Sequence, residues 1–423
     1  MTRFPWVQAD RRHIWHPYTQ HFGAPDPVPI VRAQGAYLYD AGGRRIFDAI
    51  SSWWVTLHGH AHPAIAGAIA AQALQLEQVI FAGFTHEPAA RLADELVRVL
   101  PTGLTRVFFS DDGSTAVEVA LKVALQYWKN QGVRRPLVAA LERAYHGDTF
   151  GAMSVSGRGI FTDAFGDHLF EVARLPDPAG GDTVGALGQL LDRHGGEVAA
   201  LIVEPLLLGA GGMRVWDADT LRRLRSLTAE RGILLIADEV LTGFGRTGPL
   251  FACERAGIAP DILCLAKGLT GGFLPLGVTA VREDLFESFS SSDRTHTLYH
   301  GHSYTANPLA CSAARASMAL LDGASRARRA SIEAEHGYQL GTLRTHPSVR
   351  SPRILGTVAA FDLRGAPSYL HPVGHALAEF ALREGVLLRP LGNVVYLLPP
   401  YCSTSDDLDT AYAVIRAFLE RRC

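Results

Sequence analysis

The stretch DILCLAKGLTGG, residues 261–272, places a single lysine, Lys267, directly after a short apolar run. The chain has 40 lysine and arginine residues together, and lysine stands only at positions 122, 129 and 267. An amine behind an apolar strand is costly to bury, but unlike a guanidinium it can lose its proton and attack a carbonyl. The stretch therefore indicates either a reactive lysine or a partly buried lysine paired with a carboxylate.

Similar apolar runs occur earlier in the chain. They read PLVAALE, AALIVEP and GILLIADEV, and helical segments separate them. Strands of this kind are buried on both faces of a parallel sheet, and their alternation with helices is typical of an open α/β sheet. We expect a large domain over about 60–310 with a mostly parallel sheet. An N-terminal segment, 1–59, and a C-terminal small α+β domain, 311–423, complete the predicted organisation.

The composition argues against several classes of protein. The net charge is −2 and there is no long basic run, which excludes a typical nucleic-acid binder. No apolar stretch approaches the length of a membrane span, and the first residues lack the apolar core of a signal peptide. The five cysteines are widely spaced without a CxxC pair, which indicates a reducing compartment. We therefore expect a cytoplasmic protein.

Polar groups follow several of the expected strands. Gly113 and Ser114 open a helix after TRVFFS, where free N–H groups and the positive end of the helix dipole suit a phosphate. In the same helix, Thr115 and Glu118 have the spacing of a capping box. Tyr145 follows PLVAALE, and its ring could cover a flat heteroaromatic ligand.

Two carboxylates end the next apolar strand. Asp238 and Glu239 are adjacent in GILLIADEV, so they point to opposite faces and need separate partners. A protonated pyridine nitrogen would suit one of them. Open α/β sheets bind ligands outside the carboxyl ends of their strands. Together with Lys267, these groups predict a site for pyridoxal 5'-phosphate, attached to the lysine amine, with an acid on the ring nitrogen.

Two motifs support other functions. GFGRTG, residues 243–248, matches the GxGxxG pattern of dinucleotide-binding proteins, although the two carboxylates just before it would repel phosphates. The alternate histidines of HGHAHP, 58–63, and HGH, 300–302, could share a strand face and bind zinc, but the proline of the first set favours a turn. A nicotinamide-dependent (NAD) oxidoreductase, a metal hydrolase and a non-catalytic scaffold remain as alternatives. We expect no metal in the favoured reading.

Longer stretches carry a family resemblance. ADEVLTGFGRTG, DILCLAKGLTGG, AYHGDTFGAMSVSG and NPLACSAA resemble class III aminotransferases of pyridoxal-phosphate fold type I, over nearly the whole chain. HIWHPYTQ, DAISSWWVTLHGHAHP and LLRPLGNVVYLLPPY are similar to the branch that serves biotin biosynthesis. That implies amino transfer from S-adenosylmethionine to 8-amino-7-oxononanoate. The alternatives are lysine as donor to the same acceptor, or another class III omega-aminotransferase. Leu241 stands where many members have glutamine, which argues against an ornithine- or aminobutyrate-type enzyme.

The resemblance implies roles at the cofactor. Lys267 would attach the cofactor and carry the proton between substrate and cofactor. Asp238 would keep the ring nitrogen protonated. Tyr145 would stack on the ring and border the substrate. Gly113 and Ser114 would bind the phosphate.

The resemblance also implies a substrate pocket. Tyr18 would take part in catalysis and, with Trp53 and Trp54, would line a pocket for a long aliphatic substrate. Arg389 would pair with the substrate carboxylate, for which its two-pronged guanidinium is suited. Gly301 would contact the substrate through its backbone.

The same resemblance implies a homodimer with shared active sites, in which His302 and Ser303 reach the phosphate in the other subunit. The best-known members have proline and threonine at these positions. Serine keeps the hydroxyl donor, whereas His302 changes the rigidity of the loop. The segment GHSYT also resembles a branch that takes the amino group from lysine, so the donor stays open between S-adenosylmethionine and lysine.

Overall fold

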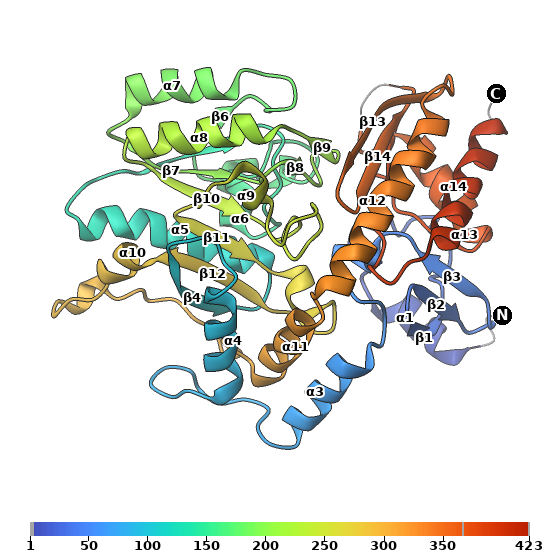
Figure 1. Ribbon diagram of the computed structural model, residues 1–423, viewed down its shortest axis with the longest axis horizontal. Coiled ribbons are helices and arrows are strands. Elements are labelled where there is room, and N and C mark those ends of the chain that lie inside the picture. Colours follow the sequence, from blue (N-terminus) through green and yellow to red (C-terminus); the bar gives the residue numbers. More distant parts are fainter. Residues whose placement is uncertain (1–3, 366–367, 422–423) are drawn as a thin grey trace.

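A seven-stranded sheet forms the centre of the larger body in the computed structural model, which describes residues 4–365 and 368–421 (Figure 1). The strand order is β4-β12-β11-β10-β7-β5-β6. The bounds are β4 (Leu104–Ser110), β5 (Leu137–Leu141), β6 (Ala173–Leu175), β7 (Val198–Val203), β10 (Leu234–Asp238), β11 (Ile262–Leu265) and β12 (Gly277–Arg282). β12 runs antiparallel to both neighbours, and the other pairs are parallel. The predicted mostly parallel sheet is confirmed.

The central strands are buried because helices cover both faces of the sheet. In β7, Leu201 and Val203 pack into the core beneath α7 and α8, whereas Ala200 and Ile202 pack into the core beneath α5. This arrangement explains why the strand is apolar at every position. The helices of these two layers are α5 (Gly113–Asn130), α6 (Phe150–Val155), α7 (Thr183–His194), α8 (Ala218–Glu230), α9 (Ala252–Ala256) and α10 (Glu283–Glu287).

Further elements surround the sheet. α11 (Pro308–Ala319) packs against both α3 (Pro63–Ala73) and α4 (Glu87–Val97) at one end of the larger body (Figure 1). Three short 3-10 helices and a small hairpin complete it: η1 (Asp163–His168), η2 (Lys267–Thr270), η3 (Arg294–His296), β8 (Leu207–Leu208) and β9 (Arg214–Val215).

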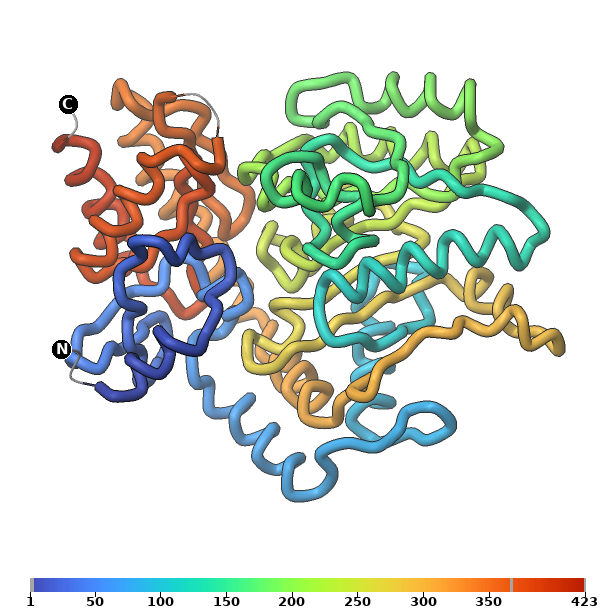
Figure 2. The backbone as a smooth tube through the Cα atoms, turned by 180° about the vertical axis from the view of Figure 1, so that it is seen from behind, coloured from blue at the N-terminus to red at the C-terminus, as the bar shows by residue number. Residues whose placement is uncertain are grey.

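The second body combines the two ends of the chain, which lie side by side in Figure 2. Its first sheet has the order β1-β2-β3-β15 and its second the order β13-β14-β16. The strands are β1 (Ile30–Gln34), β2 (Tyr37–Asp40), β3 (Arg45–Asp48), β13 (Val349–Leu355), β14 (Val358–Leu363), β15 (Val386–Leu387) and β16 (Val394–Leu397). The helices are α1 (Pro5–His13), α2 (Ser51–Trp54), α12 (Gly323–Leu343), α13 (Pro372–Arg383) and α14 (Ser405–Glu420). The proposed division at residues 59/60 and 310/311 remains a prediction.

One local prediction is wrong. The capping box of α5 is formed by Asp112 and Thr115, not by Thr115 and Glu118. The helix begins at Gly113, as expected, but its N-cap is Asp112, which accepts from the N–H of Thr115. Glu118 instead accepts hydrogen bonds from the hydroxyl of Thr149 and the N–H of Gly151.

Two sequence-based expectations concern the whole chain. Cys253, Cys264, Cys311 and Cys402 are free thiols, and Cys423 lies outside the described residues. No helix in the described part of the chain is both long and apolar enough to span a membrane.

Candidate active site

A cavity of about 610 Å³ lies at the carboxyl ends of β4, β5, β7, β10 and β11. Open α/β sheets bind their ligands at this edge. Most of the predicted site residues line the cavity: Tyr18, Trp53, Trp54, Gly113, Ser114, Tyr145, Asp238, Lys267 and Arg389. The structure therefore brings together groups that are dispersed over most of the sequence.

Lys267 is the first residue of η2, directly beyond β11, and has a left-handed backbone with φ of 44°. Its Nζ lies 4.8 Å from the centre of the Trp54 ring. Among residues 4–365 and 368–421, no carboxylate forms an ion pair with this amine. Burial lowers its pKa, against the opposite effect of the negative charges of Asp238 and Glu204. The reading of Lys267 as half of a structural salt bridge is therefore wrong.

Asp238 is held by a buried histidine. The Nδ1 of His146 lies 2.7 Å from the Oδ2 of Asp238, and the imidazole must donate because a carboxylate only accepts. The other carboxylate of the pair, Glu239, faces away and accepts from the N–H groups of Ala252 and Cys253. The prediction that the two acids need separate partners is confirmed.

Glu204 is a pocket residue that the sequence reasoning missed. It follows β7, and its two oxygens accept from the N–H groups of Tyr145 and Gly209, both at 2.9 Å. Burial raises its pKa to about 7, despite the nearby His146. A signal was present in the sequence, because Glu204 ends the apolar run AALIVEP just as Asp238 ends its own.

The N-terminus of α5 faces the cavity. Gly113 and Ser114 line it, and first-turn N–H groups have no partner within a helix. Asp112 caps Thr115 at 2.7 Å and leaves these two N–H groups to a ligand. A Cβ at Gly113 would lie 2.6 Å from the Cγ1 of Val240, so glycine is required for this close approach.

Aromatic rings line the cavity beside the guanidinium of Arg389. The guanidinium of Arg389 lies 4.6 Å from the centre of the Trp53 ring, and the Tyr18 ring lies edge-on to Trp53 at 5.4 Å. The hydroxyl of Tyr18 donates to Asp148 and lies 3.3 Å from that of Tyr145. Burial raises the pKa of both tyrosines, so both remain protonated. Asp148 was not identified from the sequence.

Gly301, His302 and Ser303 do not line this cavity. The Nε2 of His302 lies 3.8 Å from the Oδ1 of Asp111, and the carbonyl oxygen of Ser303 accepts from Gln78 at 2.8 Å. The structure of one chain thus leaves these three residues outside its own pocket.

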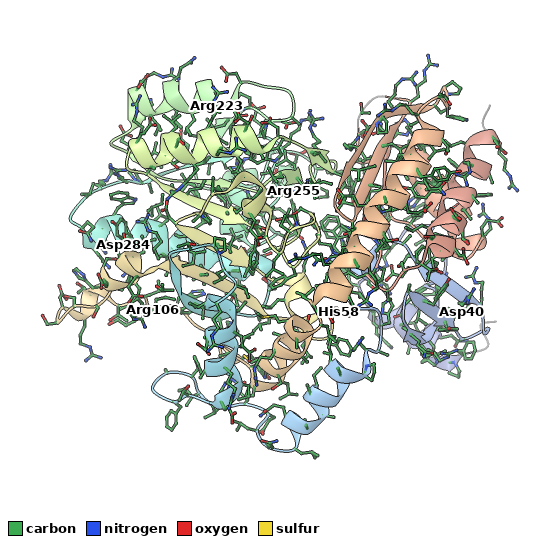
Figure 3. The ribbon with its side chains drawn as sticks, in the orientation of Figure 1. Asp40, His58, Arg106, Arg223, Arg255 and Asp284 are labelled. Carbon is green, nitrogen blue, oxygen red and sulfur yellow. The ribbon has the colours of Figure 1, made fainter. Side chains whose placement is uncertain are left out.

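The motifs of the rival functions do not form the sites they would require. GFGRTG does not open a helix, since α9 begins only at Ala252. His58, which lies close to where the two bodies meet (Figure 3), has its Nε2 3.1 Å from the hydroxyl of Ser317. His60 instead pairs with Asp48. In the described residues there is no cluster of three or more potential metal ligands.

Comparisons with known proteins agree with this geometry. The family description "Aminotransferase class-III" matches residues 19–419. A protein of Synechococcus elongatus named adenosylmethionine-8-amino-7-oxononanoate aminotransferase is 54% identical, over 96% of this chain and 98% of that protein. A protein of the same name from Geobacter sulfurreducens is 38% identical, over 95% of this chain and 94% of its own length.

Solved structures show the same relationship. The adenosylmethionine-8-amino-7-oxononanoate aminotransferase of Methanocaldococcus jannaschii has a TM-score of 0.93 and 34% identity, over 97% of this chain and 98% of that one. An amine transaminase from an uncultivated Pseudomonas species, in its pyridoxal-phosphate-bound form, has a TM-score of 0.90 and 34% identity, with the same coverage. The predicted fold class, pyridoxal-phosphate fold type I, is confirmed. The chain therefore belongs to the class-III aminotransferase family.

Proposed function

We propose that this protein is the pyridoxal-phosphate-dependent transaminase of biotin biosynthesis that transfers an amino group from S-adenosylmethionine to 8-amino-7-oxononanoate, giving 7,8-diaminononanoate. The relative at 54% identity over nearly the full length of both chains supports this reaction. The observation that carries it is one aromatic pocket containing both Lys267 and Arg389, two basic side chains without carboxylate partners in the described chain. The amine of Lys267 can react with a carbonyl, and the guanidinium of Arg389 can bind a carboxylate.

The residues of the pocket fit pyridoxal phosphate. The start of α5 suits its phosphate, because it has free N–H groups and a glycine, Gly113, where a side chain would not fit. Asp238, buried and fixed by His146, suits a protonated ring nitrogen. The amine of Lys267 suits its carbonyl, and Tyr145, which lines the same cavity, would cover its ring.

The side chains then divide the chemistry between them. Bound pyridoxal phosphate supplies a carbonyl and an electron-withdrawing ring. Lys267 has a lowered pKa, so a larger fraction of its Nζ is neutral near pH 7 and can take up and return a proton. Asp238 would hold a proton on the ring nitrogen, and His146 fixes the carboxylate that would do so.

The acceptor fits the other end of the pocket. 8-Amino-7-oxononanoate has a carboxylate at the end of an aliphatic chain. Arg389 would bind the carboxylate with two hydrogen bonds, and the Trp53 and Trp54 rings would cover the chain. Tyr18 stays protonated and donates to Asp148, so its oxygen would accept a hydrogen bond from the substrate.

A donor screen tests the reaction. Purified protein is loaded with pyridoxal phosphate and given 8-amino-7-oxononanoate with S-adenosylmethionine or with lysine, and 7,8-diaminononanoate is measured. Product with S-adenosylmethionine supports the proposal. Product with lysine alone keeps the acceptor and replaces the donor. Absence of product with both overturns the assignment to biotin biosynthesis.

The covalent link to the lysine has its own test. The loaded protein should be yellow and should lose the colour on treatment with borohydride. Mass mapping of the digest should then find the cofactor on the peptide containing Lys267. A colourless protein that takes up no pyridoxal phosphate contradicts the cofactor assignment.

We also propose a cytoplasmic homodimer in which Gly301, His302 and Ser303 complete the site of the other subunit. Their position outside the pocket of their own chain supports this arrangement. So do the exposed apolar side chains Leu74, Ile80 and Phe84 beside α3 and α4, which a second subunit could cover.

A further inference from the structure

Trp53 and Trp54 enter the pocket from a turn with an unusual backbone. Ser51, Ser52 and Trp54 have φ values of 53°, 59° and 69°, and none of them is glycine. Side chains disfavour this left-handed region, so such residues persist only where the surrounding structure holds them. Three such residues among the four of the turn Ser51–Trp54 indicate that contacts with other parts of the chain hold the turn in this conformation.

Asp48 holds the centre of the turn, while the Ser51 hydroxyl donates to the carbonyl of Leu398 and the Trp54 indole to the hydroxyl of Tyr396. Asp48 is the last residue of β3 and its side chain is fully buried. Its Oδ1 accepts from the N–H of Ile50 at 3.3 Å, and its Oδ2 accepts from the N–H of Ser52 at 2.6 Å and from its hydroxyl at 3.2 Å. These bonds stabilise the conformation that the side chains disfavour.

His60 is the counterpart of this carboxylate. Its Nε2 lies 2.9 Å from the Oδ2 of Asp48, and no arginine or lysine pairs with Asp48 in the described chain. The backbone of His60 is fixed in turn, because it exchanges hydrogen bonds with Gly35 at 2.7 and 3.2 Å. A buried carboxylate requires such a donor, and here the donor has a defined position.

The same strand connects the turn to the cation of the pocket. β3 pairs in parallel with β15, where Asp48 lies opposite Leu387. Arg389 follows two residues later and lies against the ring of Trp53. Asp48 is therefore connected to both residues. Its strand pairs with the strand that leads to Arg389, and its hydrogen bonds fix the turn that carries Trp53.

We propose that Asp48 and His60 are positioning residues for the acceptor end of the pocket. Neither residue lines the cavity. They act through the turn Ser51–Trp54, whose hydrogen bonds to Asp48 hold Trp53 against Arg389. The role in binding 8-amino-7-oxononanoate rests on the proposed function, but the position of the tryptophans does not.

The test combines a spectroscopic and a kinetic measurement on the full-length holoenzyme. Protein labelled with 5-fluorotryptophan is studied by ¹⁹F NMR, and single Trp→Phe variants assign the resonances of Trp53 and Trp54. Asp48→Asn and His60→Leu should shift or broaden these two resonances and leave those of Trp128 and Trp216 in place. The KM for 8-amino-7-oxononanoate should rise about tenfold, since a buried hydrogen bond is lost, while kcat changes by less than about threefold.

His60→Gln is the conservative variant, because its amide can still donate to Asp48, and it should restore most of the wild-type spectrum and KM. Asp261→Asn is the matched control. Asp261 is as deeply buried as Asp48 and accepts from the N–H of Leu235 at 2.7 Å, but it directly precedes β11 of the seven-stranded sheet, does not line the pocket, and also pairs with Arg225 and Arg282. It should lower the melting temperature without moving the Trp53 and Trp54 resonances.

Three results would overturn the proposal. One is unchanged Trp53 and Trp54 resonances with a KM within twofold of wild type. Another is equal shifts of all the tryptophan resonances, which indicates a general structural role. The third is identical behaviour of His60→Leu and His60→Gln. If Asp48→Asn does not fold, the two His60 variants decide. If wild-type protein makes no 7,8-diaminononanoate, the proposed function fails, and the NMR result still tests the positioning.

Discussion

The ionisable side chains of the pocket are accommodated in different ways. Asp238 is bound by the His146 imidazole, and Glu204 by two peptide N–H groups. Lys267 and Arg389 instead lie over tryptophan rings. Asp238 and Glu204 therefore have partners within the protein, whereas Lys267 and Arg389 have no carboxylate partner among the described residues. The Arg389 guanidinium is stabilised when a ligand brings the missing negative charge, and the Lys267 amine is left free to react with a carbonyl.

Arg389 provides a prediction at this scale. Arg389→Ala removes a two-bond contact to the acceptor carboxylate, which should cost about 2–5 kcal/mol of acceptor binding if the pair is desolvated. Arg389→Lys should restore only part of the acceptor affinity, because an ammonium does not reproduce the two parallel hydrogen bonds of a guanidinium. The acceptor affinity and the rate of the donor half-reaction are measured side by side, and the donor rate should change less.

Arg106→Ala is the control for Arg389, because Arg106 also lies over an aromatic ring, that of Phe286 at 4.2 Å, but on the surface. It should leave the acceptor affinity unchanged. Wild-type acceptor affinity in Arg389→Ala would show that the carboxylate binds elsewhere.

Glu204 provides a pH-dependent prediction. Its folded-state pKa is about 7 against an ordinary value of 4.5, because burial disfavours the charged form. The unfolded chain therefore loses the proton first, and the stability that this group contributes falls as the pH rises from about 4.5 to about 7. The loss is at most about 3 kcal/mol. Below this range the contribution is complete, and above it the stability levels off.

The variant Glu204→Gln isolates this effect, since glutamine has a similar shape and does not titrate. Urea unfolding of the apoprotein at a series of pH values gives the free energy of unfolding of both forms. The difference between them should change in favour of the variant between about pH 4.5 and about pH 7 and then stay constant. A difference independent of pH would show that Glu204 is already ionised at the lower end of this range.

At the scale of elements, the sequence predicted the strands that are buried on both faces. β5, β7, β10 and β11 appear as continuous apolar runs because helices cover both sides of the sheet. The positions of Asp238 and Lys267 follow, since each stands where such a run ends. The capping residue of α5 was misplaced by one turn, because several residues near its start can serve as caps and only the backbone conformation selects Asp112.

The N-terminus of α5 leads to a prediction for this element. Gly113→Ala places a Cβ within 2.6 Å of the Val240 side chain, so the helix start or Val240 must move. Binding of pyridoxal phosphate by the apoprotein should weaken by about tenfold, as one or two charge-assisted hydrogen bonds to the phosphate are strained. The dissociation constant is measured by titration of the absorbance.

The control for this helix is Gly188→Ala in α7, where no atom lies within 4 Å of the added Cβ. It should leave cofactor binding unchanged and stabilise the protein slightly, because alanine favours the helix. Equal cofactor affinity in Gly113→Ala and wild type would mean that the phosphate binds away from the start of α5.

At the scale of the whole molecule, the pocket is built from segments distant in the sequence. Tyr18 and Trp53 come from the N-terminal segment, Lys267 from the large sheet and Arg389 from the segment after β15. Pattern reasoning alone cannot reveal these contacts, because no periodicity relates residues so far apart. The family resemblance placed them in one site, and the pairing of β3 with β15 shows how the chain brings two of them together. Asp148 and the Asp48–His60 pair became visible only through their hydrogen bonds, whereas Glu204 had a signal in the sequence that was missed.

The proposed sharing of active sites is the last prediction, and it concerns two chains. Lys267→Ala should be inactive in its own pocket. Ser303→Asp should be nearly inactive because a carboxylate beside the phosphate in the other subunit is repulsive. In a mixed dimer, one site carries both changes. The other site has the Lys267 of the Ser303→Asp chain and the unchanged Ser303 of the Lys267→Ala chain, so it is intact.

Mixing the two inactive variants under conditions of subunit exchange should therefore restore activity, up to about a quarter of that of the wild-type protein if exchange is random, since half of the dimers are mixed and each has one intact site. Different affinity tags on the two chains measure the mixed dimers directly, and Lys267→Ala exchanged with itself is the control. Mixed dimers without activity would show that Ser303 acts within its own chain or away from the phosphate. If light scattering gives the unmixed protein a mass of 45.7 kDa, which is the mass of one chain, the protein is not a dimer. The experiment tests the arrangement of the subunits separately from the chemistry, because activity is restored only if Ser303 of one chain contributes to the pocket of the other.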